Sequence, residues 1–189
     1  MNPGEGDRAA ILVEGPSDRR AIETLARLRG RDLRAEGVVV VPMGGVTNIG
    51  HFLERLGPRG RGLRLAGMCD AAEEHHVRRA LERTGYGAAL SRAEMARLGF
   101  HVCVVDLEDE LIRALGTDRV ERTLAAEGEL ASFRVLQKQP AQRDRELGRQ
   151  LRRFLGCRSG RKARYAGLLV EALDPARPPE PLERVLAQV

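Results

Sequence analysis

Residues 12–18 read LVEGPSD, a sequence that predicts the end of a strand, a tight turn and the start of a helix. The stretch closes an apolar run over residues 9–14, and a helical pattern then continues until Gly30. Proline is tolerated in a first helical turn, and Ser or Asp can cap a helix. The stretch therefore places one acid, Glu14, at a strand end and a second, Asp18, in the first turn of a helix.

Three further apolar runs predict strands, at residues 37–42, 63–69 and 100–105. Helical patterns separate them, at residues 47–56, 72–83 and 91–98. Strands that alternate with helices are typical of a parallel α/β sheet. The part after residue 106 has helical patterns at residues 108–116, 118–127, 142–155, 161–173 and 182–188. We therefore predict an α/β core of about four parallel strands over residues 1–106 and a basic, helical C-terminal extension over residues 107–189.

Three of the four predicted strands end in an acid, namely Glu14, Asp70 and Asp106. Ligands of open parallel sheets bind beyond the carboxyl ends of the strands. Acids gathered there repel one another unless a cation neutralises them, and hard oxygen ligands favour Mg²⁺ or Mn²⁺. Acids that follow strands also often cap helices, so the pattern by itself leaves both interpretations open.

Composition excludes several classes of protein. The chain has 189 residues, which fits one domain and is too short for an ATPase fused to a nuclease. Aromatic residues make up only 3%, without Trp, which argues against a single-strand binder built on stacked aromatic platforms. The three cysteines are far apart, and the chain shows neither a signal core nor a membrane-length apolar run. These features predict a cytoplasmic protein without a disulfide framework or zinc knuckle.

Basic charge is concentrated in one segment. The net charge is +5, yet residues 131–170 contain eleven Lys or Arg against two acids, a local +9, so the rest sums to −4. Such a face is the usual electrostatic footprint of nucleic-acid binding. A solvated helix surface or a docking face for an acidic partner is the alternative. The candidate nucleic-acid contacts are Arg149, Arg152, Arg153, Arg158, Arg161 and Arg164.

Together these residues resemble the TOPRIM domain, the metal-binding fold of topoisomerases, bacterial primases and OLD (overcoming lysogenization defect) nucleases. The Glu14-Gly15 pair follows the first strand, Gly44-Gly45 follows the second, and Asp70 follows the third. The spacing of Glu14 and Asp18, the run from Asp106 to Leu111 and the Gly160-Arg161-Lys162 region resemble the OLD branch. The TOPRIM resemblance covers roughly residues 8–106, and weaker OLD-like motifs extend it to about residue 188.

The resemblance implies a TOPRIM (Rossmann-like) fold and a metal-dependent endonuclease. One or two Mg²⁺ or Mn²⁺ ions would be bound by Glu14, Asp18, Asp70, Glu73 and Glu108. Four further acids are held in reserve as ligands, namely Glu74, Asp106, Asp109 and Glu110. Glu14 is alternatively a general acid or base. Lys162, one of only two lysines in the chain, would stabilise the charge of the transition state or protonate the leaving oxygen. A solvent-exposed lysine at a helix start is the other interpretation of Lys162.

The sequence departs from the family pattern in two places. Ala72 stands where the usual Asp-x-Asp motif has its second aspartate, and no phosphate-binding loop marks an ATPase domain, since His51 follows the glycines where a lysine is needed. Two other functions therefore remain open. One is a non-catalytic module that binds metal and DNA and acts with a separate ATPase chain; the other is an RNA-processing nuclease. DNA is the preferred nucleic-acid partner.

Overall fold

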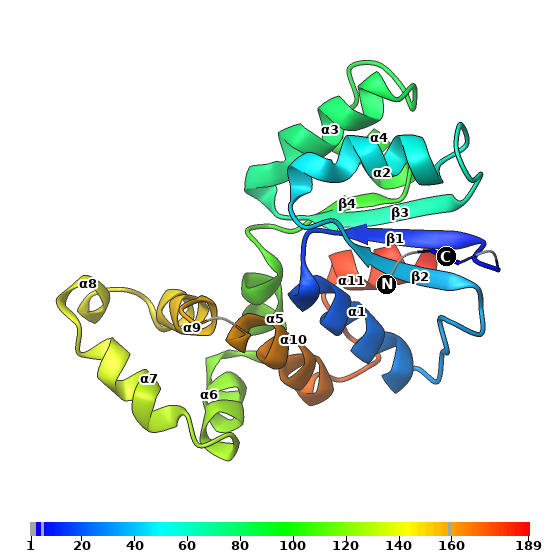
Figure 1. Cartoon of the computed structure of the whole chain (residues 1–189). Coiled ribbons are helices and arrows are strands. Elements are labelled where there is room, and N and C mark those ends of the chain that lie inside the picture. The colour runs from blue at the N-terminus through cyan, green and yellow to red at the C-terminus, as the bar shows by residue number, and fades with distance from the viewer. Residues whose placement is uncertain (1–2, 5, 159) are drawn as a thin grey trace.

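The computed structural model describes residues 3–4, 6–158 and 160–189. Four strands form one fully parallel sheet in the order β2-β1-β3-β4 (Figure 1). They are β1 (Ala9–Val13), β2 (Val38–Pro42), β3 (Arg64–Cys69) and β4 (Phe100–Val102). The predicted parallel α/β fold is therefore confirmed. No helix within the described ranges is long and apolar enough to cross a membrane.

The central strand β1 is buried on both faces because its side chains alternate between two hydrophobic clusters. Ile11 and Val13 belong to one cluster, and Ala10 and Leu12 belong to the other. Helices cover both faces of the sheet (Figure 1). The helices on one face are α2 (Ile49–Leu56), α3 (Glu74–Arg83) and α4 (Arg92–Arg97); those on the other are α1 (Pro16–Leu28) and α11 (Glu180–Ala187). Short 3₁₀ turns, η1 (Val46–Asn48) and η2 (Ala71–Glu73), precede α2 and α3.

The remaining helices form a lobe beside the sheet (Figure 1). They are α5 (Leu107–Leu115), α6 (Thr117–Ala126), α7 (Leu130–Gln137), α8 (Pro140–Arg143), α9 (Leu147–Gly156) and α10 (Arg161–Ala172).

The sequence patterns missed α7 and merged α8 with α9. Gly128, with a φ of +71°, turns the chain between α6 and α7, and α7 buries only Phe133 and Leu136 among its eight residues, which leaves a weak helical pattern. The predicted helix at 142–155 is interrupted because the side chain of Gln150 donates hydrogen bonds to the carbonyl oxygens of Gln142 and Arg145 (2.8 and 3.0 Å). These bonds satisfy backbone groups that a continuous helix would otherwise pair.

The helical lobe and the sheet share one hydrophobic core. Ile11 of β1, Leu111 of α5, Phe154 of α9 and Val185 of α11 all belong to the same buried cluster. Helix α10 packs closely along α1, and α11 packs against β3 and β4. This packing brings the start of α10 to the carboxyl end of the sheet.

Candidate metal centre

The acids predicted at the strand ends converge at one edge of the sheet. Glu14 follows β1 and Asp70 follows β3, and these two strands are neighbours. Asp106 lies beyond β4, and a hydrogen bond from the backbone N–H of Ala71 to the carbonyl oxygen of Val105 (3.0 Å) ties the two loops together. The sheet order thus places the three acids side by side.

The turn between β1 and α1 positions Glu14 and Asp18. The Asp18 carboxylate accepts a hydrogen bond from the backbone N–H of Gly15 (2.9 Å), which caps α1 and buries Asp18 to 8% exposure. Burial, followed by repulsion from Asp18, raises the pKa of Glu14. Burial also raises the pKa of Asp18 in spite of the hydrogen bond from Gly15. Both carboxyl groups therefore lack the solvation that ordinarily favours their charged forms.

Asp70 lies between these acids and those that follow β4. Burial and then the charge of Asp106 raise the pKa of Asp70 to about 7, while Lys162 acts in the opposite direction. Asp18 and Glu14 add further repulsion. Carboxylates whose negative charges repel one another in this way attract a cation, which would neutralise them.

Lys162, at the start of α10, supplies the positive charge opposite these acids. Its Nζ lies 3.1 Å from Oε2 of Glu108. Burial is the largest single influence and lowers the pKa of Lys162, but Glu108, Asp18 and Asp70 together raise it by more, so the net change is a rise. Lys162 also lowers the pKa values of Glu14 and Asp18 relative to what burial alone would give. The lysine singled out by its rarity therefore faces the predicted ligand set.

Asp106 is a member of this group that the predicted ligand set held only in reserve. Its Oδ1 caps α5 by accepting a hydrogen bond from the backbone N–H of Asp109 (2.9 Å), and its Oδ2 lies 2.5 Å from Nε of Arg152. Its position at a strand end, like those of Glu14 and Asp70, was the available sequence signal. The sequence held no signal for its pairing with Arg152, since 46 residues separate the two.

Glu108 provides the test of whether a metal ion fits here. Its side chain belongs to a residue only 4% exposed, and its Oε1 is buried with no hydrogen-bond partner. An unpaired buried carboxylate oxygen is costly, and a divalent cation satisfies it. As they stand, however, the described side chains include no group of three or more His, Cys, Asp or Glu residues close enough together to hold an ion. Carboxylate oxygens are suitable ligands for Mg²⁺ or Mn²⁺, but these side chains must move closer together to bind either ion.

Glu73 and Ala72 lie on η2, at the margin of the group. Glu73 is near enough to Glu14 to raise its pKa, and its Oε2 lies 3.7 Å from Nε2 of His76. Ala72 is exposed and has no oxygen to offer. Glu73 is therefore the acid of this segment that can take the place of the missing aspartate.

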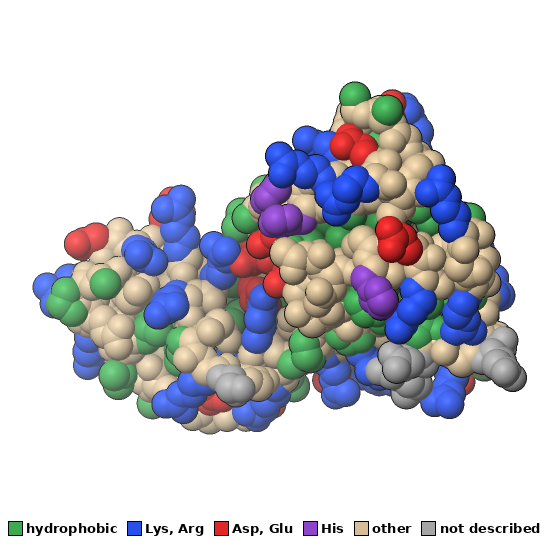
Figure 2. Space-filling view, turned by 45° about the horizontal axis from the view of Figure 1, so that its top comes forward, with side chains coloured by type: hydrophobic (Ala, Val, Ile, Leu, Met, Phe, Trp, Pro, Cys, Tyr) green, Lys and Arg blue, Asp and Glu red, His purple; other side chains and the backbone are tan. Residues whose placement is uncertain are grey.

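Five of the six candidate nucleic-acid residues are exposed. Arg149, Arg152, Arg153 and Arg158 lie on the surface of the helical lobe, where Arg149 pairs with Glu146 and Arg152 with Asp106. Arg164 is also exposed, but it forms ion pairs with Glu127 and Glu129. Figure 2 shows acidic side chains in the hollow between the two parts of the molecule, with basic side chains along the lobe.

Arg161 has a structural position rather than a place on this surface. It is 6% exposed, its guanidinium lies 2.5 Å from Glu129, and its Cζ lies 4.0 Å from the centre of the Phe154 ring. The prediction that it contacts nucleic acid is not supported, because the hydrophobic core of the lobe encloses it. Sequence spacing alone did not distinguish this buried arginine from its exposed neighbours.

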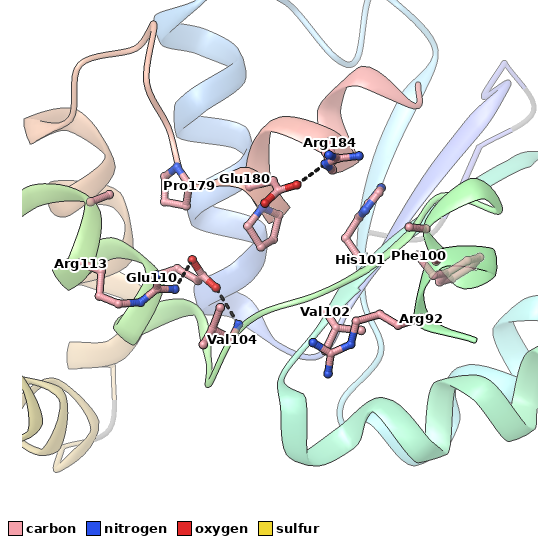
Figure 3. A pocket seen from close by; sticks show the side chains of 14 residues that line it. Arg92, Phe100, His101, Val102, Val104, Glu110, Arg113, Pro179, Glu180 and Arg184 are labelled. Carbon is pink, nitrogen blue, oxygen red and sulfur yellow. Dashed lines mark hydrogen bonds and ion pairs between the residues drawn. The ribbon is translucent and has the colours of Figure 1, made fainter. Parts of the chain in front are cut away.

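A cavity of about 750 Å³ lies at the free edge of β4, apart from the acids described above. Figure 3 shows His101 and Phe100 of β4 between Arg92 on one side and Arg184 on the other. Glu110 closes one end by accepting a hydrogen bond from the backbone N–H of Val104 (2.7 Å). This cavity holds none of the predicted site residues.

The comparisons with known proteins agree with this fold. A family model described as "Overcoming lysogenization defect protein-like, TOPRIM domain" matches residues 7–70. A structure of the C-terminal region of the Xanthomonas campestris pv. campestris OLD protein is 25% identical and covers 98% of this chain and 95% of its own, with a TM-score of 0.69. Residues 7–70 of this chain thus resemble the TOPRIM domain of OLD-like proteins, and nearly the whole chain is similar in fold to an OLD C-terminal region.

Other solved structures share the fold over nearly the whole chain. The C-terminal region of the Burkholderia pseudomallei OLD protein is 19% identical and covers 96% of each chain, with a TM-score of 0.73. None of the curated proteins matches. The OLD-like TOPRIM model includes Glu14, Asp18 and Asp70, whereas Glu73, Glu108 and Lys162 lie outside its residues and within the extent of the structural similarity.

Proposed function

We propose that this OLD-like TOPRIM protein is a divalent-metal-dependent endonuclease that hydrolyses phosphodiester bonds of DNA in the cytoplasm. The observation that carries the proposal is the convergence of Glu14, Asp18, Asp70 and Glu108, with an unsatisfied buried oxygen on Glu108 and Lys162 opposite. Several partly buried carboxylates placed together without enough positive charge destabilise a fold, so a purely structural role does not explain them.

Each group has a role in the proposed reaction. Glu14, Asp18, Asp70, Glu73 and Glu108 would hold one or two Mg²⁺ or Mn²⁺ ions, which when bound supply Lewis acidity and an activated water. The ammonium of Lys162 stabilises the negative charge that develops on the phosphate or donates a proton to the leaving oxygen. Glu14 is half-buried with a raised pKa, and so it is also suited to act as a general acid or base.

The exposed arginines of the lobe would bind the phosphate backbone. Lys138, Arg143, Arg145, Arg153 and Arg158 are exposed and have no ion pair within the described ranges. Free guanidinium groups bind phosphates through charge and paired hydrogen bonds. The acids would otherwise repel the substrate.

The direct test is incubation of supercoiled plasmid with the protein and Mn²⁺. We expect nicking or linearisation by the unaltered protein, and its loss in Glu14→Ala and Asp70→Ala. Asp144→Ala is the matched control, because Asp144 is an exposed acid on the lobe with no ion pair among described residues. Cleavage that survives Glu14→Ala together with Asp70→Ala would overturn the proposal.

Ala72 favours a second candidate, a module that binds metal and nucleic acid without catalysis and acts with a separate ATPase chain. Under this alternative, calorimetry detects binding of Mg²⁺ and of DNA, but no substrate is cleaved. Parallel assays on RNA hairpins and duplex DNA distinguish an RNA-processing nuclease from a DNA endonuclease. Cleavage confined to the hairpins would change the proposed substrate and leave the metal centre in place.

A further inference from the structure

Arg152 is part of the basic surface of the lobe and also contacts the group of acids. Its side chain, on α9, is 43% exposed, while that of its partner Asp106 is only 11% exposed. The Arg152–Asp106 ion pair therefore lies where the nucleic-acid surface of the lobe meets the candidate metal centre.

Both oxygens of Asp106 are engaged in this arrangement. Oδ1 caps α5 through the backbone N–H of Asp109, and Oδ2 receives Nε of Arg152 at 2.5 Å. Among the charges that raise the pKa of Asp70, that of Asp106 is the largest. The hydrogen bond from the N–H of Ala71 to the carbonyl oxygen of Val105 (3.0 Å) joins the residue after Asp70 to the residue before Asp106, so the two acids are neighbours, and Asp106 can offer Oδ2 to a cation only if Arg152 gives it up.

A guanidinium binds a phosphate with the same geometry that it uses for a carboxylate. Arg152 is partly exposed and has Arg149 and Arg153 beside it on α9, so a nucleic-acid backbone bound to this surface competes with Asp106 for it. When phosphate takes the guanidinium, Oδ2 of Asp106 loses its partner and becomes available to a divalent cation.

We infer that Arg152 couples the two binding events: it occupies Oδ2 of Asp106 in the free protein and frees that oxygen for the metal ion when nucleic acid binds. The inference rests on the proposed function and assigns Arg152 a positioning role. By linkage, nucleic acid then strengthens metal binding by the same factor as metal strengthens nucleic-acid binding.

The first test is Mn²⁺ affinity measured by calorimetry without nucleic acid. We expect Arg152→Ala to bind Mn²⁺ about fivefold more tightly than the unaltered protein, because the ion no longer competes with a guanidinium. Arg113→Ala is the matched control: Arg113 is also a half-exposed arginine paired with acids of α5, Asp109 and Glu110, outside the metal centre. Arg152→Gln, checked for folding by thermal melting, guards against a defect specific to the alanine variant.

The second test repeats the titration at saturating levels of a short phosphorothioate DNA duplex, which resists cleavage, and of its RNA counterpart. We expect the unaltered protein to gain about fivefold in Mn²⁺ affinity with at least one of them, and Arg152→Ala to gain nothing. Weaker Mn²⁺ binding by Arg152→Ala, or no gain in the unaltered protein with either duplex, would overturn the inference and leave the proposed metal centre intact. Failure of the unaltered protein to bind Mn²⁺ at all would instead overturn the proposed function.

Discussion

Asp70→Asn should make the metal-free protein more stable above neutral pH. Burial and the neighbouring acids raise the pKa of Asp70 from an ordinary value near 3.9 to about 7. Asp70 therefore binds its proton more tightly in the folded than in the unfolded chain. The free energy of unfolding must then fall as pH rises from about 4 to about 7, and must stay lower above that range.

The size of the effect follows from the same pKa. A difference of one unit corresponds to about 1.4 kcal/mol, which would give about 4 kcal/mol for the full rise. Partial solvent screening reduces the expected gain of Asp70→Asn to about 1–2 kcal/mol at pH 8, or roughly 3–6 °C in Tm for a chain of this size. At about pH 3 the variant and the unaltered protein should melt together, because Asp70 is then largely protonated in both states.

The assay is thermal unfolding followed by circular dichroism, with a chelator present and then with Mn²⁺. Mn²⁺ should stabilise the unaltered protein, because it binds the folded state, and should stabilise Asp70→Asn far less. Asp144→Asn is the control and should change the unfolding free energy by less than about 0.5 kcal/mol at either pH. Equal or lower stability of Asp70→Asn at pH 8 would refute the conclusion that the acids repel one another in the metal-free protein.

Three further changes test other parts of the structure. Gly67→Ala should destabilise the protein by about 1–3 kcal/mol in a denaturant titration, because its Cβ would lie 2.8 Å from the Phe100 ring; an unchanged midpoint would contradict the close packing of β3 and β4. Arg161→Ala should cost about 1–3 kcal/mol by the same measurement, since it removes the ion pair with Glu129 and the packing of the guanidinium on the Phe154 ring; an effect on DNA affinity alone would contradict its structural role. Arg153→Glu with Arg158→Glu should weaken DNA binding and make the dependence of affinity on salt less steep, as measured by fluorescence anisotropy; unchanged binding would remove Arg153 and Arg158 from the interface.

The sequence contained enough information for the sheet and for the meeting of the strand-end acids at one edge. Uninterrupted apolar runs predict strands buried on both faces, and the acids that follow them converge because parallel strands end at the same edge. Asp106 and Arg152 show where this reasoning stopped. A strand-end acid can cap a helix, bind a metal or pair with an arginine, and Asp106 does the first and third of these in the structure. Only the packing of α9 near α5 decides which of these three roles Asp106 has.

Arg161 shows a second limit. A periodic run of arginines on a predicted helix does not reveal which of them faces the core. Burial of Arg161 depends on Glu129 and Phe154, which precede it by 32 and 7 residues and meet it only because α6, α7, α9 and α10 pack together. Long-range packing of this kind leaves no local pattern in the sequence.

The counter-charges of the acidic group come from the helical lobe. Glu14, Asp18 and Asp70 belong to the sheet part, whereas Lys162 and Arg152 belong to α10 and α9. Without the lobe the acids would face one another with neither cation present, and their repulsion would oppose folding of the sheet. The lobe therefore acts as an internal counterion for the metal-free protein as well as the proposed nucleic-acid surface. A substrate that engages its arginines necessarily changes the charge balance at the acids, which is why metal binding and substrate binding should be measured together in this protein.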